Sequence, residues 1–227
     1  MLAEIVVHAD STPAGIRRVA LARALAQSHG ARLVGVGEGV TSPEGLAEWR
    51  PVKGLRPLAL HARYADLTIM GQTPFGAPDH VTDLLMNVGR PLLVVPLHGS
   101  FPVVGQRVLV AWNASREATR AVFDALALLK KASLVTVMTM DADVDEGRVA
   151  GADISLALAR HGVAVEIVHS TLGDLDAGNA LLSRASDCGA DLLVMGAFGH
   201  SPLREKVLGG ATRHILGHMT VPVLLSH

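Results

Sequence analysis

An internal repeat constrains the fold of this chain more than any other feature of its sequence. Three segments of the first half recur in the same order in the second half. The matched pairs are EIVVHAD (4–10) with RVLVAWN (107–113), ADLTIMG (65–71) with ADLLVMG (190–196), and RPLLVVP (90–96) with VPVLL (221–225). Each member of the first pair precedes a helical pattern, over 13–28 and 116–130 respectively. Three matches in one order indicate a duplication.

The spacing between matched positions shows which copy is complete. Asp10 and Asn113 lie 103 residues apart, Asp66 and Asp191 lie 125 apart, and Pro91 and Pro222 lie 131 apart. The first copy is therefore shorter, by 22 residues and then by a further 6. The larger loss falls between strands near 32–36 and 47–52 and amounts to about one helix. We interpret the Gly35-Val-Gly37-Glu-Gly39 segment there as a mark of the deletion.

The second copy predicts the complete structural unit. We expect strands at 107–113, 133–139, 163–169, 191–195 and 221–225, with helices at 116–130, 151–161, 175–187 and 203–218. Strands that alternate with helices of this length predict βαβ units in a parallel sheet. The fold class is therefore α/β, with two tandem Rossmann-like domains, each an open, mainly parallel sheet with flanking helices. We expect a shortened domain over 1–99 and a complete domain over 105–227.

Charge and hydropathy exclude several classes of partner. Lys and Arg number 20 against 21 Asp and Glu, so no basic field attracts nucleic acid or anionic lipid. No apolar run approaches the roughly 18–20 residues of a membrane-spanning helix. The N-terminal segment lacks the basic region of a signal peptide, and the single Cys188 suits a reducing compartment. We expect a cytoplasmic protein with neither nucleic acid nor membrane as a partner.

The candidate binding residues follow the strands of the second copy, because open parallel sheets bind ligands beyond their carboxyl ends. These residues are Ala111, Trp112, Asn113, Met138, Thr139, Met195, Gly196, Gly199, His200, Arg204, Gly209, Gly210, Ala211 and Thr212. Glycines allow a ligand to approach the backbone, and free amides at a helix start can hold phosphates. The glycines are equally explained as turn residues, and Arg204 as a solvated helix residue.

The spacing Gly196-x2-Gly199-x9-Gly209 resembles the ATP-binding signature of the universal stress protein family, in which Ser or Thr follows the third glycine. The whole chain resembles a tandem member of that family, most strongly over 107–227. The resemblance implies an adenine-nucleotide α-hydrolase-like fold and ATP or a related adenine nucleotide as ligand, with Mg²⁺ if it is bound. It also implies pairing of the two domains through their last strands. Apolar surface left by the shortened half would also allow a homodimer.

Two residues depart from the family pattern. Gly210 stands where the family has Ser or Thr, with Thr212 two places on, and Asn113 stands where nucleotide-binding members usually have Asp. In the first copy the third glycine is missing, and Pro74 and Pro78 remove amides that a phosphate would need. We interpret that copy as degenerate, with pairing as its role and no nucleotide bound.

Two functions remain open. The first is a nucleotide-responsive stress protein that acts through ligand-dependent interaction rather than catalysis. The second is a tandem scaffold whose glycine loop is a remnant. No catalytic motif is recognised, and His200 is the one candidate base for slow ATP hydrolysis. His214 and His218 share a helix face but lack further ligands, so we expect no metal site.

Overall fold

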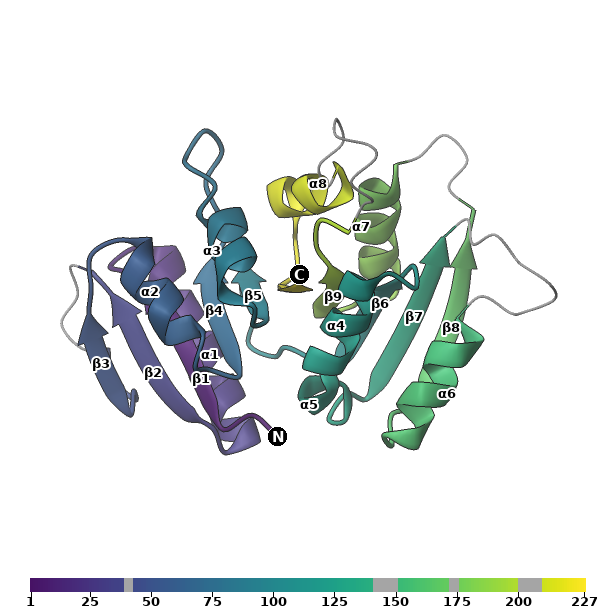
Figure 1. The fold of residues 1–227 in the computed structure, drawn as a ribbon, viewed down its shortest axis with the longest axis horizontal. Helices are drawn as coiled ribbons and strands as arrows, with labels where there is room; N and C mark the ends of the chain where they lie inside the picture. The colour runs from purple at the N-terminus through teal and green to yellow at the C-terminus, as the bar shows by residue number, and fades with distance from the viewer. Residues whose placement is uncertain (39–42, 141–150, 172–175, 200–209) are drawn as a thin grey trace.

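The computed structural model describes residues 1–38, 43–140, 151–171, 176–199 and 210–227. Its ten strands are β1 (Glu4–Ala9), β2 (Arg32–Gly37), β3 (Glu48–Pro51), β4 (Leu67–Gly71), β5 (Leu92–Val95), β6 (Arg107–Trp112), β7 (Leu134–Met140), β8 (Val165–Ser170), β9 (Leu192–Gly196) and β10 (Val223–Ser226). The helices are α1 (Pro13–His29), α2 (Leu55–Ala62), α3 (His80–Val88), α4 (Arg116–Asp124), α5 (Leu126–Leu129), α6 (Ala152–Arg160), α7 (Ala177–Asp187) and α8 (Gly210–His218) (Figure 1). Over these ranges, no helix combines the length and apolar character needed to cross a bilayer.

All ten strands form one sheet in the order β3-β2-β1-β4-β5-β10-β9-β6-β7-β8. The pairs within each group of five are parallel, as the alternation of strands and helices predicts, whereas β5 and β10 are antiparallel. Strand direction therefore reverses at the centre of the sheet. The carboxyl ends of the N-terminal strands consequently lie at the opposite edge from those of the C-terminal strands.

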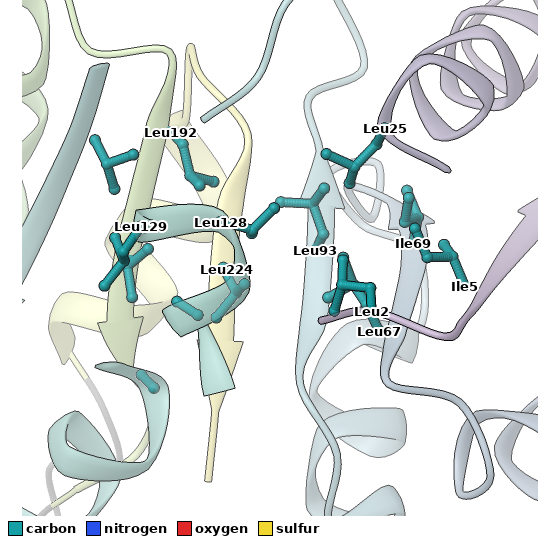
Figure 2. Close-up of a cluster of buried hydrophobic side chains, with 14 of the residues drawn as sticks. Leu2, Ile5, Leu25, Leu67, Ile69, Leu93, Leu128, Leu129, Leu192 and Leu224 are labelled. Atoms are coloured by element: carbon teal, nitrogen blue, oxygen red, sulfur yellow. The ribbon is translucent and has the colours of Figure 1, made fainter. Parts of the chain in front are cut away.

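The two halves share their hydrophobic core across this central pair. Leu93 of β5 lies opposite Leu224 of β10, and both are fully buried. They belong to one cluster that runs beneath α1, α4, α5 and α6, and Figure 2 shows Leu93 and Leu128 facing each other across the junction. A second cluster lies on the other face of the sheet, beneath α2, α3, α7 and α8. The sheet is therefore covered on both faces, as a parallel sheet requires.

The two halves differ between their second and third strands. The C-terminal half has α6 there, and α6 contributes Ile154 and Leu158 to the shared core. In the N-terminal half the described residues between β2 and β3 form no helix, and Leu46 and Trp49 pack against the same core instead. The helix predicted to be missing is thus replaced by two side chains.

The glycines of β2 make room for these two side chains. A Cβ atom at Gly35 would overlap Leu46 and would lie 2.9 Å from Cε3 of Trp49. A Cβ atom at Gly37 would overlap the carbonyl oxygen of Ala9 and lie 3.2 Å from Cη2 of Trp49. Because a side chain fits at neither position, these glycines have a packing role beyond marking a deletion.

The expected helices and strands are present, and most of their ends differ from the expected ones by one or two residues. The helix expected over 116–130 is divided at Ala125, where Leu128 donates an i→i+3 bond of 2.8 Å to the Ala125 carbonyl and tightens the turn. The last strand begins at Val223 rather than residue 221, after Pro222, which has no N–H to donate to a ladder. The helix expected over 203–218 is described from Gly210 onward, and its first residues lie outside the described ranges.

We expect Trp49→Ala to lower the free energy of unfolding by about 2–3 kcal/mol. A fully buried Trp truncated to Ala costs about 3–5 kcal/mol, and Trp49 is only partly buried. Urea denaturation measures the change, with Phe75→Ala as the control, because Phe75 is fully exposed. Equal stability of the two variants would show that Trp49 does not replace the helix.

Candidate functional site

The carboxyl end of β6 turns directly into α4 through a short polar segment. The Asn113 side-chain oxygen accepts a hydrogen bond of 3.2 Å from the Ser115 amide, and Ala114 adopts φ +56°. Ser115 caps α4 by accepting a bond of 3.1 Å from the Ala118 amide. Asn113 is exposed at the tip of this turn, and its amide nitrogen donates no hydrogen bond to another described residue. That group is therefore available to a ligand.

The two described glycines of the motif lie directly against the start of α4. A Cβ atom at Gly196 would overlap the backbone of Glu117 and Ala118. A Cβ atom at Gly199 would lie 2.6 Å from Oε2 of Glu117. Both positions thus have a packing reason to be glycine, in addition to the turn and ligand-approach explanations that the sequence offers.

Thr212 connects the end of β9 to the start of α8. Its Oγ1 accepts a hydrogen bond of 3.3 Å from the Phe198 amide, and Thr212 is buried. Phe198 has φ +56°, an uncommon value for a residue other than glycine. Because the hydroxyl accepts from Phe198, its own hydrogen remains able to donate to a ligand.

A cavity of about 90 Å³ lies between these segments. Seven predicted site residues line it: Ala111, Asn113, Met195, Gly196, Gly199, Ala211 and Thr212. Its other three lining residues, which were not among the predicted site residues, are Ser115, Leu181 and Phe198. Ser115 was recognisable as a helix cap and Phe198 lies within the Gly196-x2-Gly199 motif, whereas Leu181 carries no sequence signal for a site.

The other predicted residues lie elsewhere or outside the described ranges. Trp112 packs against the core beneath α4, and Met138 is buried on the opposite face. The Thr139 hydroxyl lies 3.2 Å from Nδ1 of His169, and Gly210 is exposed at the start of α8. His200, Arg204 and Gly209 fall outside the described residues.

Glu117 brings a negative charge to the glycine segment. Its carboxylate is nearly buried beside Gly199 and pairs with Arg116 at 3.0 Å. Burial alone would raise the pKa of Glu117, but hydrogen bonds from its own backbone amide and from Arg116, with the charges of Arg116 and His227, hold that pKa below its usual value. The carboxylate is therefore ionised at neutral pH and repels anions.

The paired histidines of α8 are a surface feature. Their rings stack with centroids 4.4 Å apart, and Nδ1 of His218 lies 2.9 Å from the His214 carbonyl oxygen. Within the described ranges, no three His, Cys, Asp or Glu side chains gather in a way that could hold a metal ion.

Comparison with known proteins identifies the family. The model of the universal stress protein family matches residues 105–227, which is more than half of the chain. The chain belongs to the universal stress protein family. No curated protein matches it. The match covers the half that contains the glycine spacing.

Solved structures show the same fold at low sequence identity. A universal stress protein from Archaeoglobus fulgidus DSM 4304 is 15% identical, over 98% of this chain and 95% of that one, with a TM-score of 0.73. A functionally unknown protein from Pseudomonas aeruginosa PAO1 is also 15% identical, over 99% and 92%, with a TM-score of 0.63. A universal stress protein solved in complex with cAMP is 24% identical over 55% of this chain and 98% of that one, with a TM-score of 0.43. The two longer matches extend over both halves, so the Rossmann-like fold holds for the whole chain.

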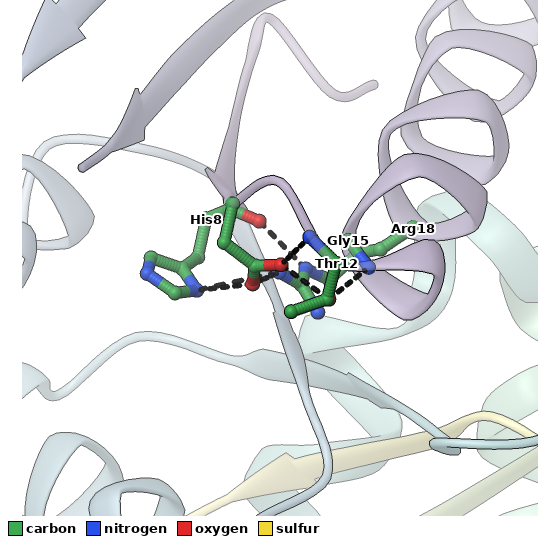
Figure 3. A network of polar contacts seen from close by, with 5 residues as sticks. His8, Thr12, Gly15 and Arg18 are labelled. Atoms are coloured by element: carbon green, nitrogen blue, oxygen red, sulfur yellow. Dashed lines mark hydrogen bonds and ion pairs between the residues drawn. The ribbon is translucent and has the colours of Figure 1, made fainter. Parts of the chain in front are cut away.

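The N-terminal half of this universal stress protein carries a polar network at the corresponding turn. Arg18 of α1 is buried, and its Nε donates to the His8 carbonyl oxygen at 2.6 Å. Its Nη2 forms an ion pair of 2.5 Å with Asp10 and lies 3.4 Å from Nδ1 of His8 (Figure 3). Asp10 also accepts from the backbone and hydroxyl of Thr12, which caps α1. Asp10 is therefore already held by its own half.

This network lowers the pKa values of both His8 and Asp10. Burial and the Arg18 guanidinium lower the pKa of His8, although Asp10 acts in the opposite direction. Burial would raise the pKa of Asp10, but the Thr12 hydrogen bond and the Arg18 charge outweigh it and lower that pKa. At neutral pH, His8 is thus neutral and Asp10 is ionised.

A cavity of about 440 Å³ adjoins this network, where sequence analysis expected no site. Its lining residues are His8, Asp10, Thr12, Ala14, Arg18, Gly37, Glu38, Val52, Gly54, Leu58, Met70, Gly71, Gln72, Thr73, Pro74, His80 and Leu97. The one sequence signal was the pair of polar residues, His8 in an apolar strand and Arg18 on an apolar helix face. In the aligned turn of the second copy these positions are Ala111 and Ala121.

We expect Asp10→Asn to lower the free energy of unfolding by about 3 kcal/mol, because it leaves Arg18 buried without its counter-charge. The pKa of Asp10 is lower in the folded protein than in the unfolded chain. Its contribution to stability is therefore complete above about pH 4 and is lost as the pH falls through the folded pKa.

Urea denaturation from pH 7 down to pH 3 measures this contribution. The wild type should lose it in acid, and the Asp10→Asn variant should show a flatter dependence on pH. Asp187→Asn is the control at an exposed aspartate. If both variants match the wild type at pH 7, the ion pair does not stabilise the fold.

Proposed function

We propose that the C-terminal half binds ATP or a related adenine nucleotide and acts in the stress response through ligand-dependent interaction rather than catalysis. The observation that carries this proposal is the Gly196-x2-Gly199-x9-Gly209 spacing, because it falls in the half matched by the family model. The spacing begins at the end of β9, which borders β6. Strand order reverses at β6, and open α/β sheets bind ligands at such a point.

The described residues fit the two ends of such a ligand. Asn113 has an exposed side-chain amide at the end of β6, suited to hydrogen bonds with a base or ribose. The backbone amides of Gly199 and Ala211 and the hydroxyl of Thr212 would face the phosphates, where the start of α8 favours negative charge. Mg²⁺, when bound with ATP, would neutralise part of the phosphate charge.

Glu117 opposes tight binding in the same place. Its ionised carboxylate lies beside Gly199 and would repel phosphate oxygens there. Two like charges 4 Å apart cost about 1 kcal/mol in water, and more where water is excluded. We therefore expect weaker binding than the glycine spacing alone would indicate.

The second candidate function is a scaffold that binds no nucleotide. The packing of Gly196 and Gly199 against the start of α4 favours it, because that contact alone requires glycine at both positions. Under this alternative the glycines serve only the contact between β9 and α4.

Several further points belong to the same proposal. The units would divide as residues 1–99 and 105–227 and pair through β5 and β10, which the antiparallel ladder between those strands supports. The protein would work in the cytoplasm, as a monomer or a homodimer, and would not hydrolyse ATP as its function.

We expect calorimetric titration of Mg²⁺-ATP into the purified chain to give saturable binding at one site per chain. Asn113→Ala should weaken it, because a polar contact is lost. Glu117→Gln should strengthen it about fivefold, the equivalent of 1 kcal/mol from the removed charge. Glu166→Gln removes the same charge from the exposed surface of β8 and should change nothing.

This titration distinguishes nucleotide binding from the scaffold function. The scaffold is favoured if millimolar nucleotide produces no heat of binding and no thermal shift, both in the wild type and in Glu117→Gln. Binding that Asn113→Ala and Glu117→Gln leave unchanged would place the nucleotide elsewhere on the molecule.

A further inference from the structure

The cavity of the N-terminal half has the size of a small-molecule site. Its volume of about 440 Å³ lies within the range of about 300–1,000 Å³ that such sites occupy. It also lies at the end of β1, where the strand order of that half reverses between β2 and β4. Both its size and its position are those of a ligand site.

Apolar side chains from several separate segments form much of the wall. Val52 follows β3, Leu58 belongs to α2, Met70 to β4, and Pro74 and Leu97 to the loops after β4 and β5. Leu58 and Met70 are almost fully buried in the core behind the cavity. A ligand that replaces water against this wall gains from burial of its own apolar surface.

The charges at the cavity disfavour an anion. Arg18 is the one Arg or Lys in the lining, and its charge is balanced by the ion pair with Asp10. Glu38 lines the mouth, is exposed, and forms no ion pair with another described residue. With His8 neutral, the Glu38 carboxylate is the uncompensated charge among the Asp, Glu and Arg side chains of the described lining, and it would repel an anionic ligand.

Several of the amides that would hold a phosphate are also absent or occupied. Pro74 and Pro78 have no N–H in the segment after β4. At the start of α1 the Thr12 amide donates to Asp10, and the Gly15 amide donates to the Thr12 hydroxyl. The positive end of this helix is thus already satisfied by Asp10 and Thr12.

Arg18 and His8 each keep a hydrogen-bond donor for a neutral ligand. Nη1 is the one guanidinium nitrogen of Arg18 without a hydrogen bond to a described residue, and it lies against Gly71, where a Cβ would overlap it. Arg18 can only donate, so Nδ1 of His8 must accept from it, and the proton of the neutral ring is on Nε2. A ligand therefore meets donors and should present an acceptor.

We infer that this cavity is a second binding site, for an uncharged and mainly apolar small molecule of one to two rings that carries a carbonyl-type acceptor. The ligand lies against Leu58 and Met70, and its acceptor faces Arg18 and His8. This site differs from the proposed nucleotide site in location, size and charge, and its test does not depend on ATP binding.

The test compares two fluorescent coumarins that differ mainly in charge. 7-Diethylamino-4-methylcoumarin is neutral and has a lactone carbonyl, whereas 7-diethylaminocoumarin-3-carboxylate is an anion at pH 7. Fluorescence titration should show saturable binding of the neutral dye at one site per chain, and at least tenfold weaker binding of the carboxylate. ATP should not displace the neutral dye.

Two pairs of variants assign the binding to this cavity. Ala14→Phe places a ring at the lining and should weaken the neutral dye at least tenfold, whereas Ala20→Phe, on the exposed face of the same helix, should not. Glu38→Gln should improve binding of the carboxylate severalfold, whereas Glu44→Gln, outside the lining, should not. Thermal unfolding of each variant verifies that it is folded.

Three outcomes would overturn the inference. They are no saturable binding of the neutral dye by the wild type, equal affinity for the two dyes, and unchanged binding in a folded Ala14→Phe variant. Competitive displacement of the neutral dye by ATP, complete at saturating ATP, would assign the dye to the nucleotide site and would overturn the inference as well.

Discussion

The antiparallel ladder between β5 and β10 is the interaction on which the rest of the structure depends. Without it, each half would expose a largely apolar edge strand, which is a hazard for aggregation. With it, the sheet continues through ten strands and the core beneath α1 and α4 becomes continuous. Side-chain bonds strengthen the junction: Gln72 Nε2 donates to the Leu216 carbonyl at 2.7 Å, and Arg120 donates to the Gly89 carbonyl at 2.6 Å. Because strand direction reverses there, the two candidate sites, which lie at the carboxyl ends of their strands, are at opposite ends of the central strand pair.

The duplicated turns show how one local geometry accommodates different chemistry. Thr12 and Ser115 cap the helices in the same way, each by accepting a bond from the amide three residues on. The residue eight places after Asp10 is Arg18, whereas the residue eight places after Asn113 is Ala121. A buried arginine requires a counter-charge, so Asp10 is held within the protein, whereas Asn113 keeps a free amide. Two differences, one at the end of the strand and one on the helix face, thus separate the chemistry of the two turns.

Much of the fold was predictable from sequence, because local signals determine it. Alternating apolar strands and helices, and the repeat with its changing spacing, predicted parallel sheets, the lost helix and the ends of β6 and β9 to within one residue. The replacement of that helix by Trp49, and the contact of Glu117 with Gly199, were not predictable. Both depend on side chains brought together from separate segments. The N-terminal cavity was missed for the same reason, since no single segment of the sequence contains its wall.

Helix α8 is the element that reaches both candidate sites. Its first turn contributes Ala211 and Thr212 to the C-terminal cavity, and near its end the Leu216 carbonyl accepts the bond from Gln72, which lines the N-terminal cavity. Gln72 Oε1 in turn accepts a bond of 3.1 Å from the amide of Leu97, another lining residue. A ligand shifts the equilibrium between two positions of such a helix only by the difference in its affinity for those positions. If α8 has two such positions, each site must alter affinity at the other by the same factor, because coupling between binding sites is reciprocal.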